Sequence, residues 1–154
     1  MAALVLTDPL IKFGGTISTG TGGLDFSDSI NSVTLSTVHD VLDVTPVKEG
    51  TIYKEVIAGV GTNSVSFDFY QDFSNNSVEE FFGGVPPYTA ESNKVGTKVT
   101  CFVRPTSAAI SASNPEYRFN VLITEWTPLN GEAGSLSTIT VNWPISGAIE
   151  KFIL

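Results

Sequence analysis

The sequence is short of the residues that carry most enzyme chemistry. Its 154 residues include one cysteine, one histidine and two tryptophans. A lone cysteine, Cys101, excludes an internal disulfide, and its neighbours Val99 and Val103 predict that the thiol is buried. The sequence also lacks a Cys/His cluster, an EF-hand spacing and a zincin motif, so it offers no metal site of a known pattern.

Long apolar runs are also missing. No stretch approaches the roughly 18 consecutive apolar residues that a membrane-spanning helix needs. The first ten residues, Met1–Leu10, lack both the basic region and the extended apolar run of a signal peptide. We therefore expect no membrane association and a chain that is made and kept in a cytoplasm.

Charge is scarce and of one sign. Charged residues make up 16% of the chain, below the usual value of about 25%, and the net charge is −8. A surface with so little charge is covered by Ser, Thr, Asn and Gly or is hidden by neighbouring subunits, and composition does not separate the two. The eight basic residues are scattered, which disfavours specific nucleic-acid binding, because that needs Lys and Arg against phosphates. The negative sign suits a surface that DNA slides past.

Period-two alternation of β-branched and aromatic residues is abundant, and it predicts β-strands. The clearest case is residues 64–72, where Val65, Phe67 and Phe69 face the same way. After His39 the apolar positions change parity, which predicts a bulge or a bend in a long strand. The expected strands cover residues 10–13, 32–45, 51–58, 64–72, 97–104, 116–126, 136–143 and 148–154.

Glycine and polar residues supply the predicted boundaries. Residues 1–28 are expected to form a glycine-rich arm or loop around the first short strand, because glycine at this density weakens regular structure. Gly59 and Gly61 are expected to end a strand. Asn130-Gly131 is a common hairpin signal.

One helix is predicted, at Ser77–Phe82, with a polar cap before it, Glu79 and Glu80 in its first turn, and glycines after it. Many short strands and one short helix favour an all-β fold, an antiparallel β-sandwich or barrel with one short flanking α-helix. No repeat or linker divides the chain, so residues 1–154 are expected to form a single domain. Such folds expose sheet edges that can pair with another chain.

Candidate catalytic groups are few and poorly matched. His39 stands beside Asp40 and near Asp43, but adjacent strand residues face opposite sides, and no G-x-S-x-G element supplies a nucleophile. Asp68 and Asp72 would be about 13 Å apart along a strand, too far for one metal ion. We therefore predict no catalytic, cofactor or metal site, and no enzyme.

Two other features have a binding interpretation alongside a structural one. Gly20–Gly23 lacks the Lys-Ser/Thr pair and the strand–loop–helix frame of a phosphate loop, which favours a flexible loop. Trp126, Trp143 and Tyr117 could form an aromatic platform for sugars, although aromatic residues on strands are more often core or interface anchors. A carbohydrate-binding module therefore stays open as an alternative.

The C-terminal half contains a specific series of strand and turn segments. The series runs through Val103–Ser107, Ser113–Phe119, Thr124–Gly131, Gly134–Ser137 and Trp143–Gly147. It resembles the major tail, or tail tube, proteins of long-tailed bacteriophages, in particular those of actinobacterial phages. The resemblance covers about residues 29–147.

The resemblance implies a β-sandwich with a flanking helix, in a subunit that forms hexameric rings stacked as a hollow tail tube. Inner strands of neighbouring subunits would join into one barrel, and DNA would pass through a negatively charged lumen without specific binding. The acids expected to face the lumen are Asp40, Asp43 and Asp68. A loop between two early strands would reach the adjacent ring. That loop is expected to comprise Thr45, Pro46, Val47, Lys48, Glu49, Gly50, Thr51, Ile52 and Tyr53.

The implied setting is a virion assembled in the host cytoplasm, with the tape measure, terminator and baseplate proteins of the tail as further partners. Other virion roles, as a capsid decoration protein or a tail terminator, fit the same fold and stay open. A hydrolase is the least favoured alternative, because no nucleophile–base pair is present.

Overall fold

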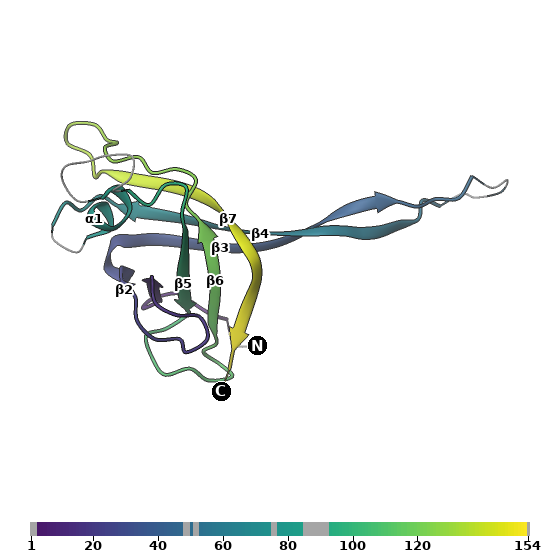
Figure 1. Cartoon of the computed structure of the whole chain (residues 1–154), viewed down its shortest axis with the longest axis horizontal. Coiled ribbons are helices and arrows are strands. Elements are labelled where there is room, and N and C mark those ends of the chain that lie inside the picture. The colour runs from purple at the N-terminus through teal and green to yellow at the C-terminus, as the bar shows by residue number, and fades with distance from the viewer. Residues whose placement is uncertain (1–2, 48–49, 51–52, 75–76, 85–92, 154) are drawn as a thin grey trace.

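The computed structural model describes residues 3–47, 50, 53–74, 77–84 and 93–153. Within them, seven antiparallel strands form one curled sheet in the order β2-β1-β5-β6-β7-β4-β3, with one short α-helix beside it (Figure 1). This confirms the predicted all-β class. The elements are β1 (Leu10–Phe13), β2 (Leu24–Asp25), the 3₁₀ turn η1 (Ser27–Ser29), β3 (Ile30–Asp43), β4 (Val56–Tyr70), α1 (Val78–Gly83), β5 (Lys98–Arg104), β6 (Glu116–Leu122) and β7 (Thr138–Phe152).

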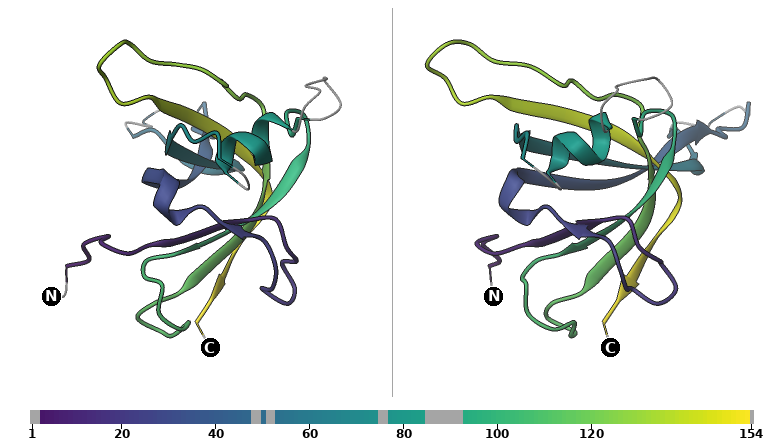
Figure 2. Two further views of the ribbon diagram at one scale, coloured as in Figure 1. Left: turned by 90° about the vertical axis from the view of Figure 1, so that its left-hand side faces the viewer. Right: turned by 60° about the vertical axis from the view of Figure 1, so that its left-hand side comes forward.

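Strand β7 joins the two halves of the sheet. Its first half pairs with β4, from Thr138 opposite Tyr70 to Pro144 opposite Ser64, and its second half pairs with β6. The strand curves strongly along its length (Figure 2). Gly147 has a φ of 90° in the stretch where the β6–β7 register shifts, a conformation that favours glycine. The curl turns the inner faces of the two halves toward each other.

The core between the two halves is built from inward-facing strand positions. Phe67 and Phe69 of β4, Phe119 of β6 and Trp143 of β7 are all fully buried. Phe13 lies at the centre, with its ring centroid 5.0–6.4 Å from those of six other aromatic rings. These six belong to Phe26, Phe67, Phe69, Phe81, Phe82 and Trp143. Helix α1 lies where it was predicted and closes one side of the core with Val78 and Phe82.

Residues 3–28 include two short strands beside the glycine-rich loop. The short strand expected at residues 10–13 is present as β1 and pairs with β2 and β5. Because alternate strand residues face the same side, both Ile11 and Phe13 point inward, and both are fully buried. This segment is therefore part of the core that the rest of the chain packs on.

Two of the predicted strand boundaries are wrong. Strand β4 runs for 15 residues through Gly59 and Gly61, and β7 runs for 15 residues through Pro144 and Gly147. The glycines of β4 do not end the strand but allow side chains of β3 to approach the β4 backbone closely. A Cβ at Gly61 would lie 2.7 Å from Cε1 of His39 on the opposite strand.

The tight hairpin expected at Asn130-Gly131 is not formed. Strand β6 pairs with the distant half of β7, with Glu116 opposite Phe152. After β6 the chain must therefore continue past the first half of β7 before it can turn and begin that strand. Residues 123–137 form this long connection. For the same reason β6 ends before the predicted limit at Trp126.

Cys101 lies in β5 and is fully buried, as predicted. Burial raises the pKa of its thiol well above the ordinary value, because desolvation disfavours the charged thiolate. The thiol therefore stays neutral and shielded in the folded chain.

Candidate functional site

Strands β3 and β4 continue well beyond the sheet and form a two-stranded ribbon that projects from the body (Figure 1). The pairing of β4 with β7 ends at Ser64, so beyond that point β3 and β4 pair only with each other among the described residues, as far as Asp43 opposite Val56. Every β3 residue from Thr37 to Asp43 is exposed. We refer to residues 37–47 and 53–63 as the ribbon.

Apolar side chains stand on both faces of the ribbon. By strand alternation Val41 and Val56 lie on one face, while Leu42 and Ile57, which are paired directly, lie on the other. These four side chains are 50–69% exposed. A lone two-stranded hairpin is only marginally stable in water, and exposed apolar patches mark interaction sites. The ribbon thus has the composition of a segment that other polypeptide covers on both sides.

A β-bulge lies near the middle of the ribbon. The register shifts between His39, opposite Gly61, and Val41, opposite Ala58, so the extra residue is on β4. This confirms the irregularity predicted from the change of parity after His39. The imidazole lies against Gly61, and its Nδ1 is 3.2 Å from the carbonyl oxygen of Gly59. His39 therefore has a local role in the bulge that needs no catalytic explanation.

The predicted inter-ring loop follows the ribbon strands at their outer end. Its residues Lys48, Glu49, Thr51 and Ile52 lie outside the described part of the chain. Thr45 fixes the start of the tip, because its N–H donates to the Asp43 carboxylate at 2.9 Å and its hydroxyl accepts from the N–H of Glu55 at 2.8 Å. Hydrogen bonds from Thr45 lower the pKa of Asp43. Lys54 adds an exposed ion pair to Asp43 at 3.5 Å.

The outward face of β3, β4 and the first half of β7 is covered with polar, mostly hydroxyl side chains. Asp68 stands in this face, and its two oxygens accept hydrogen bonds from Thr140 at 2.6 Å and from Ser32 at 2.8 Å. These bonds, the one from Thr140 first, lower the pKa of Asp68. The face comprises Ser32, Thr34, Ser36, Ser64, Ser66, Asp68, Thr138, Thr140 and Asn142. None of these residues is basic, so the face offers DNA phosphates no cationic partner.

The three acids predicted to face a lumen do not share one side of the sheet. Asp40 lies on the same side of β3 as Ser32, which places it with Asp68. Asp43 is three residues further and lies on the reverse side. Asp40 and Asp68 stay predictions for one surface, whereas Asp43 contributes to the structure of the ribbon tip.

Replacing Asp68 by Asn is expected to weaken the acid sensitivity of the fold. The folded pKa is lowered from 3.8, so the carboxylate stabilises the fold above that pH, and this stabilisation is lost as the pH falls through the folded pKa. The midpoint temperature of thermal unfolding, measured between about pH 2 and pH 7, should fall less on acidification in D68N than in the wild type. Thr140→Val removes the hydrogen bond that lowers the pKa of Asp68 most, so it should also reduce this fall. The same pH dependence in all three proteins would contradict a stabilising role for the Asp68 carboxylate.

The remaining titratable candidates have structural roles. Asp72 accepts hydrogen bonds from the N–H and the hydroxyl of Ser74, at 2.9 and 2.7 Å. Glu79 is buried, and it accepts a hydrogen bond from the Trp126 indole at 2.8 Å. Burial raises the pKa of Glu79. The described residues contain no group of three side chains that could hold a metal ion.

The aromatic platform considered for sugars is not formed. Trp143 is fully buried in the core, and Trp126 packs against Phe82 with ring centroids 4.9 Å apart. Tyr117 is partly buried and packs against the core, on β6. Within the described chain, no helix is long and apolar enough to cross a membrane.

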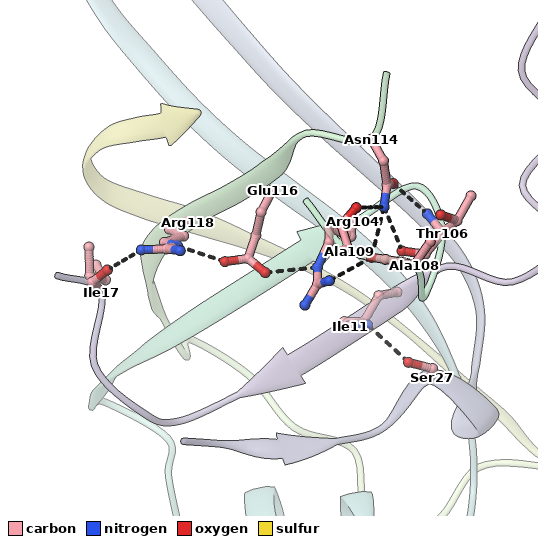
Figure 3. Close-up of polar contacts among 10 residues, drawn as sticks. All are labelled: Ile11, Ile17, Ser27, Arg104, Thr106, Ala108, Ala109, Asn114, Glu116 and Arg118. Carbon is pink, nitrogen blue, oxygen red and sulfur yellow. Dashed lines mark hydrogen bonds and ion pairs between the residues drawn. The ribbon is translucent and has the colours of Figure 1, made fainter. Parts of the chain in front are cut away.

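Sequence reasoning missed a buried ion cluster on β5 and β6 (Figure 3). The Glu116 carboxylate lies 2.6 Å from Nε of Arg118 and 2.9 Å from Nε of Arg104, the latter contact being ionic without hydrogen-bond geometry. Arg118 also donates to the carbonyl oxygen of Ile17 at 2.9 Å and lies 3.7 Å from the ring centroid of Phe152. The cluster thus fastens the glycine-rich loop and the end of β7 to the sheet. The sequence did contain a signal for the cluster: Glu116 and Arg118 are two residues apart on a strand, which places their side chains on the same face.

The sequence matches no protein-family model and no curated protein. Solved structures nevertheless share its fold. A chain in the virion of a native gene transfer agent (GTA) particle superposes with a TM-score of 0.60 at 16% identity, over 97% of this chain and 98% of that one. A chain in the tail of an empty GTA particle with C6 symmetry gives 0.58 at 16% identity, over 99% and 100%. The likeness extends over essentially the whole of each chain and includes both halves of the fold.

Proposed function

We propose that this protein is a virion structural subunit that assembles into hexameric rings, stacked as the tail tube of a phage-like particle. The ribbon carries the proposal, because a free monomer leaves its apolar side chains in water whereas stacked copies would bury them. The body has the fold of a chain from a GTA tail, and the C6 symmetry of that tail supports six subunits per ring.

Within such a ring, the free edge of β3 would pair with a strand of the neighbouring subunit. Strand β3 is the last strand of the sheet and is paired only with β4 among the described residues. A long unpaired edge invites strand addition. The hydroxyl-rich face with Asp40 and Asp68 would then line the channel, where carboxylates repel DNA phosphates and prevent adhesion.

Between rings, the ribbon and its tip loop at residues 45–53 would reach the adjacent ring. The virion setting is supported by both similar GTA structures. Tape measure, terminator and baseplate proteins as partners, and a particular likeness to proteins of actinobacterial phages, stay predictions. A capsid decoration or terminator role has no specific observation in its favour.

Electron microscopy of the purified chain tests the proposal. We expect hollow tubes of stacked rings with six-fold end views, formed as the protein concentration is raised near neutral pH. Sedimentation velocity run in parallel should show a monomer converting to very large species without stable dimers. A chain that stays monomeric at every concentration and salt level would overturn the proposal.

A further inference from the structure

The body contains an open apolar groove at the root of the ribbon, where the core is not closed. Its cavity volume is about 490 Å³. Strand β3 contributes Val33 and Leu35, while the facing side contributes Tyr117 and Ile149. These four side chains pack against the core but are only partly buried. The groove therefore presents core-like side chains to solvent, which is unfavourable unless something covers them.

The rim of the groove has one positive charge that nothing in the described chain neutralises. Lys151 lines the groove with its Nζ 6.0 Å from the ring centroid of Tyr117, and it makes no ion pair among the described residues. Arg104 also lines the groove, but its guanidinium is held by Glu116. The site thus suits an apolar segment with a net negative charge.

The ribbon has this composition. On the face that carries Val41 and Val56, the apolar side chains are followed directly by Asp43, whose ion pair with Lys54 is exposed and screened by solvent. Its described residues include three acids and one lysine, and they carry a net negative charge. These charged residues are Asp40, Asp43, Glu55 and Lys54.

We propose that the groove of one copy receives the ribbon of a copy in the adjacent ring, with Val41 near Ile149 and Asp43 near Lys151. This rests on the proposed function and names the surface that the ribbon contacts. The contact joins two different surfaces of the same chain, so it is heterologous and can repeat indefinitely along an axis. The groove and the ribbon face that carries Val41 and Val56 would be buried in a single step.

Disulfide crosslinking in assembled tubes tests the contact. In the double variant V41C/I149C, mild oxidation should produce a ladder of covalent multimers on a non-reducing denaturing gel. The matched control V41C/T140C places the second thiol on the outward sheet face and should give no ladder beyond that of V41C alone. Cys101 does not interfere, because it is fully buried.

A charge exchange gives a second, independent measurement. Lys151→Glu should raise the protein concentration needed for assembly several-fold, and adding Asp43→Lys to the same chain should restore it. Tubes that form without the specific ladder and are indifferent to K151E would overturn the groove contact and leave the tube proposal standing. A wild-type chain that forms no tubes would overturn both.

Discussion

A chain in which residues 40–60 are replaced by Asn-Gly is expected to stay folded and to lose all tube formation. The described residues among those excised contribute nothing to the buried core, and Asn-Gly can close a two-residue hairpin between the paired His39 and Gly61. The shortened protein should keep a cooperative thermal transition and sediment as a monomer. Micrographs that still show stacked rings would exclude the ribbon as the connection between them.

Point variants test whether assembly requires the apolar side chains of the ribbon as well as its backbone. V41D/I57D places a charge on each face at positions where the monomer is already exposed, so its folding should be little affected. Assembly should be abolished, because each carboxylate would have to be buried at the interface without a partner. The matched control V41T/I57T keeps uncharged, β-branched side chains and should assemble at higher concentration.

Replacing Glu116 by Gln is expected to destabilise the body strongly. Glu116 is 3% exposed, and its carboxylate compensates two guanidinium groups whose side chains are 8% and 15% exposed. Removing one member of a buried ionic network leaves uncompensated charge, which typically costs about 3–5 kcal/mol. Urea unfolding of wild type and E116Q should show this difference at pH 7.

The exposed ion pair between Lys54 and Asp43 supplies the control for Glu116. Because solvent screens this pair, Lys54→Ala should leave the urea midpoint close to that of the wild type. E116Q should also loosen the glycine-rich loop, since Arg118 holds the carbonyl oxygen of Ile17. Equal midpoints for E116Q and wild type would show that the cluster does not stabilise the fold.

The sequence pattern predicted the strands well wherever one strand face is buried, because buried and exposed positions then alternate between apolar and polar residues. Val65, Phe67 and Phe69 alternate because one face of β4 is buried, and the change of parity after His39 marks a real bulge. The strand end predicted at Gly59 and Gly61 was wrong. Glycine is common both at strand ends and where a side chain of the neighbouring strand approaches closely, and here the second explanation holds. Propensity alone does not distinguish the two, because the difference lies on the opposite strand.

The parts that depend on distant pairing could not be predicted. Asn130-Gly131 has the composition of a tight turn, but β6 pairs with the far half of β7, and only the three-dimensional register shows this. The predicted tip loop at residues 45–53 was only the end of a longer feature. Its significance comes from Val41 and Ile57 on the strands below, whose exposure depends on where β7 leaves β4.

In the proposed tail tube, the buried position of Cys101 would have a consequence outside the host cell. Outside a cell, molecular oxygen and peroxides attack thiolates that are accessible and ionised. Here the single sulfur is wholly enclosed and its raised pKa keeps it protonated, so neither requirement is met. In such a tube, the Cys101 sulfur would form neither sulfenic acid adducts nor accidental disulfide bridges between subunits.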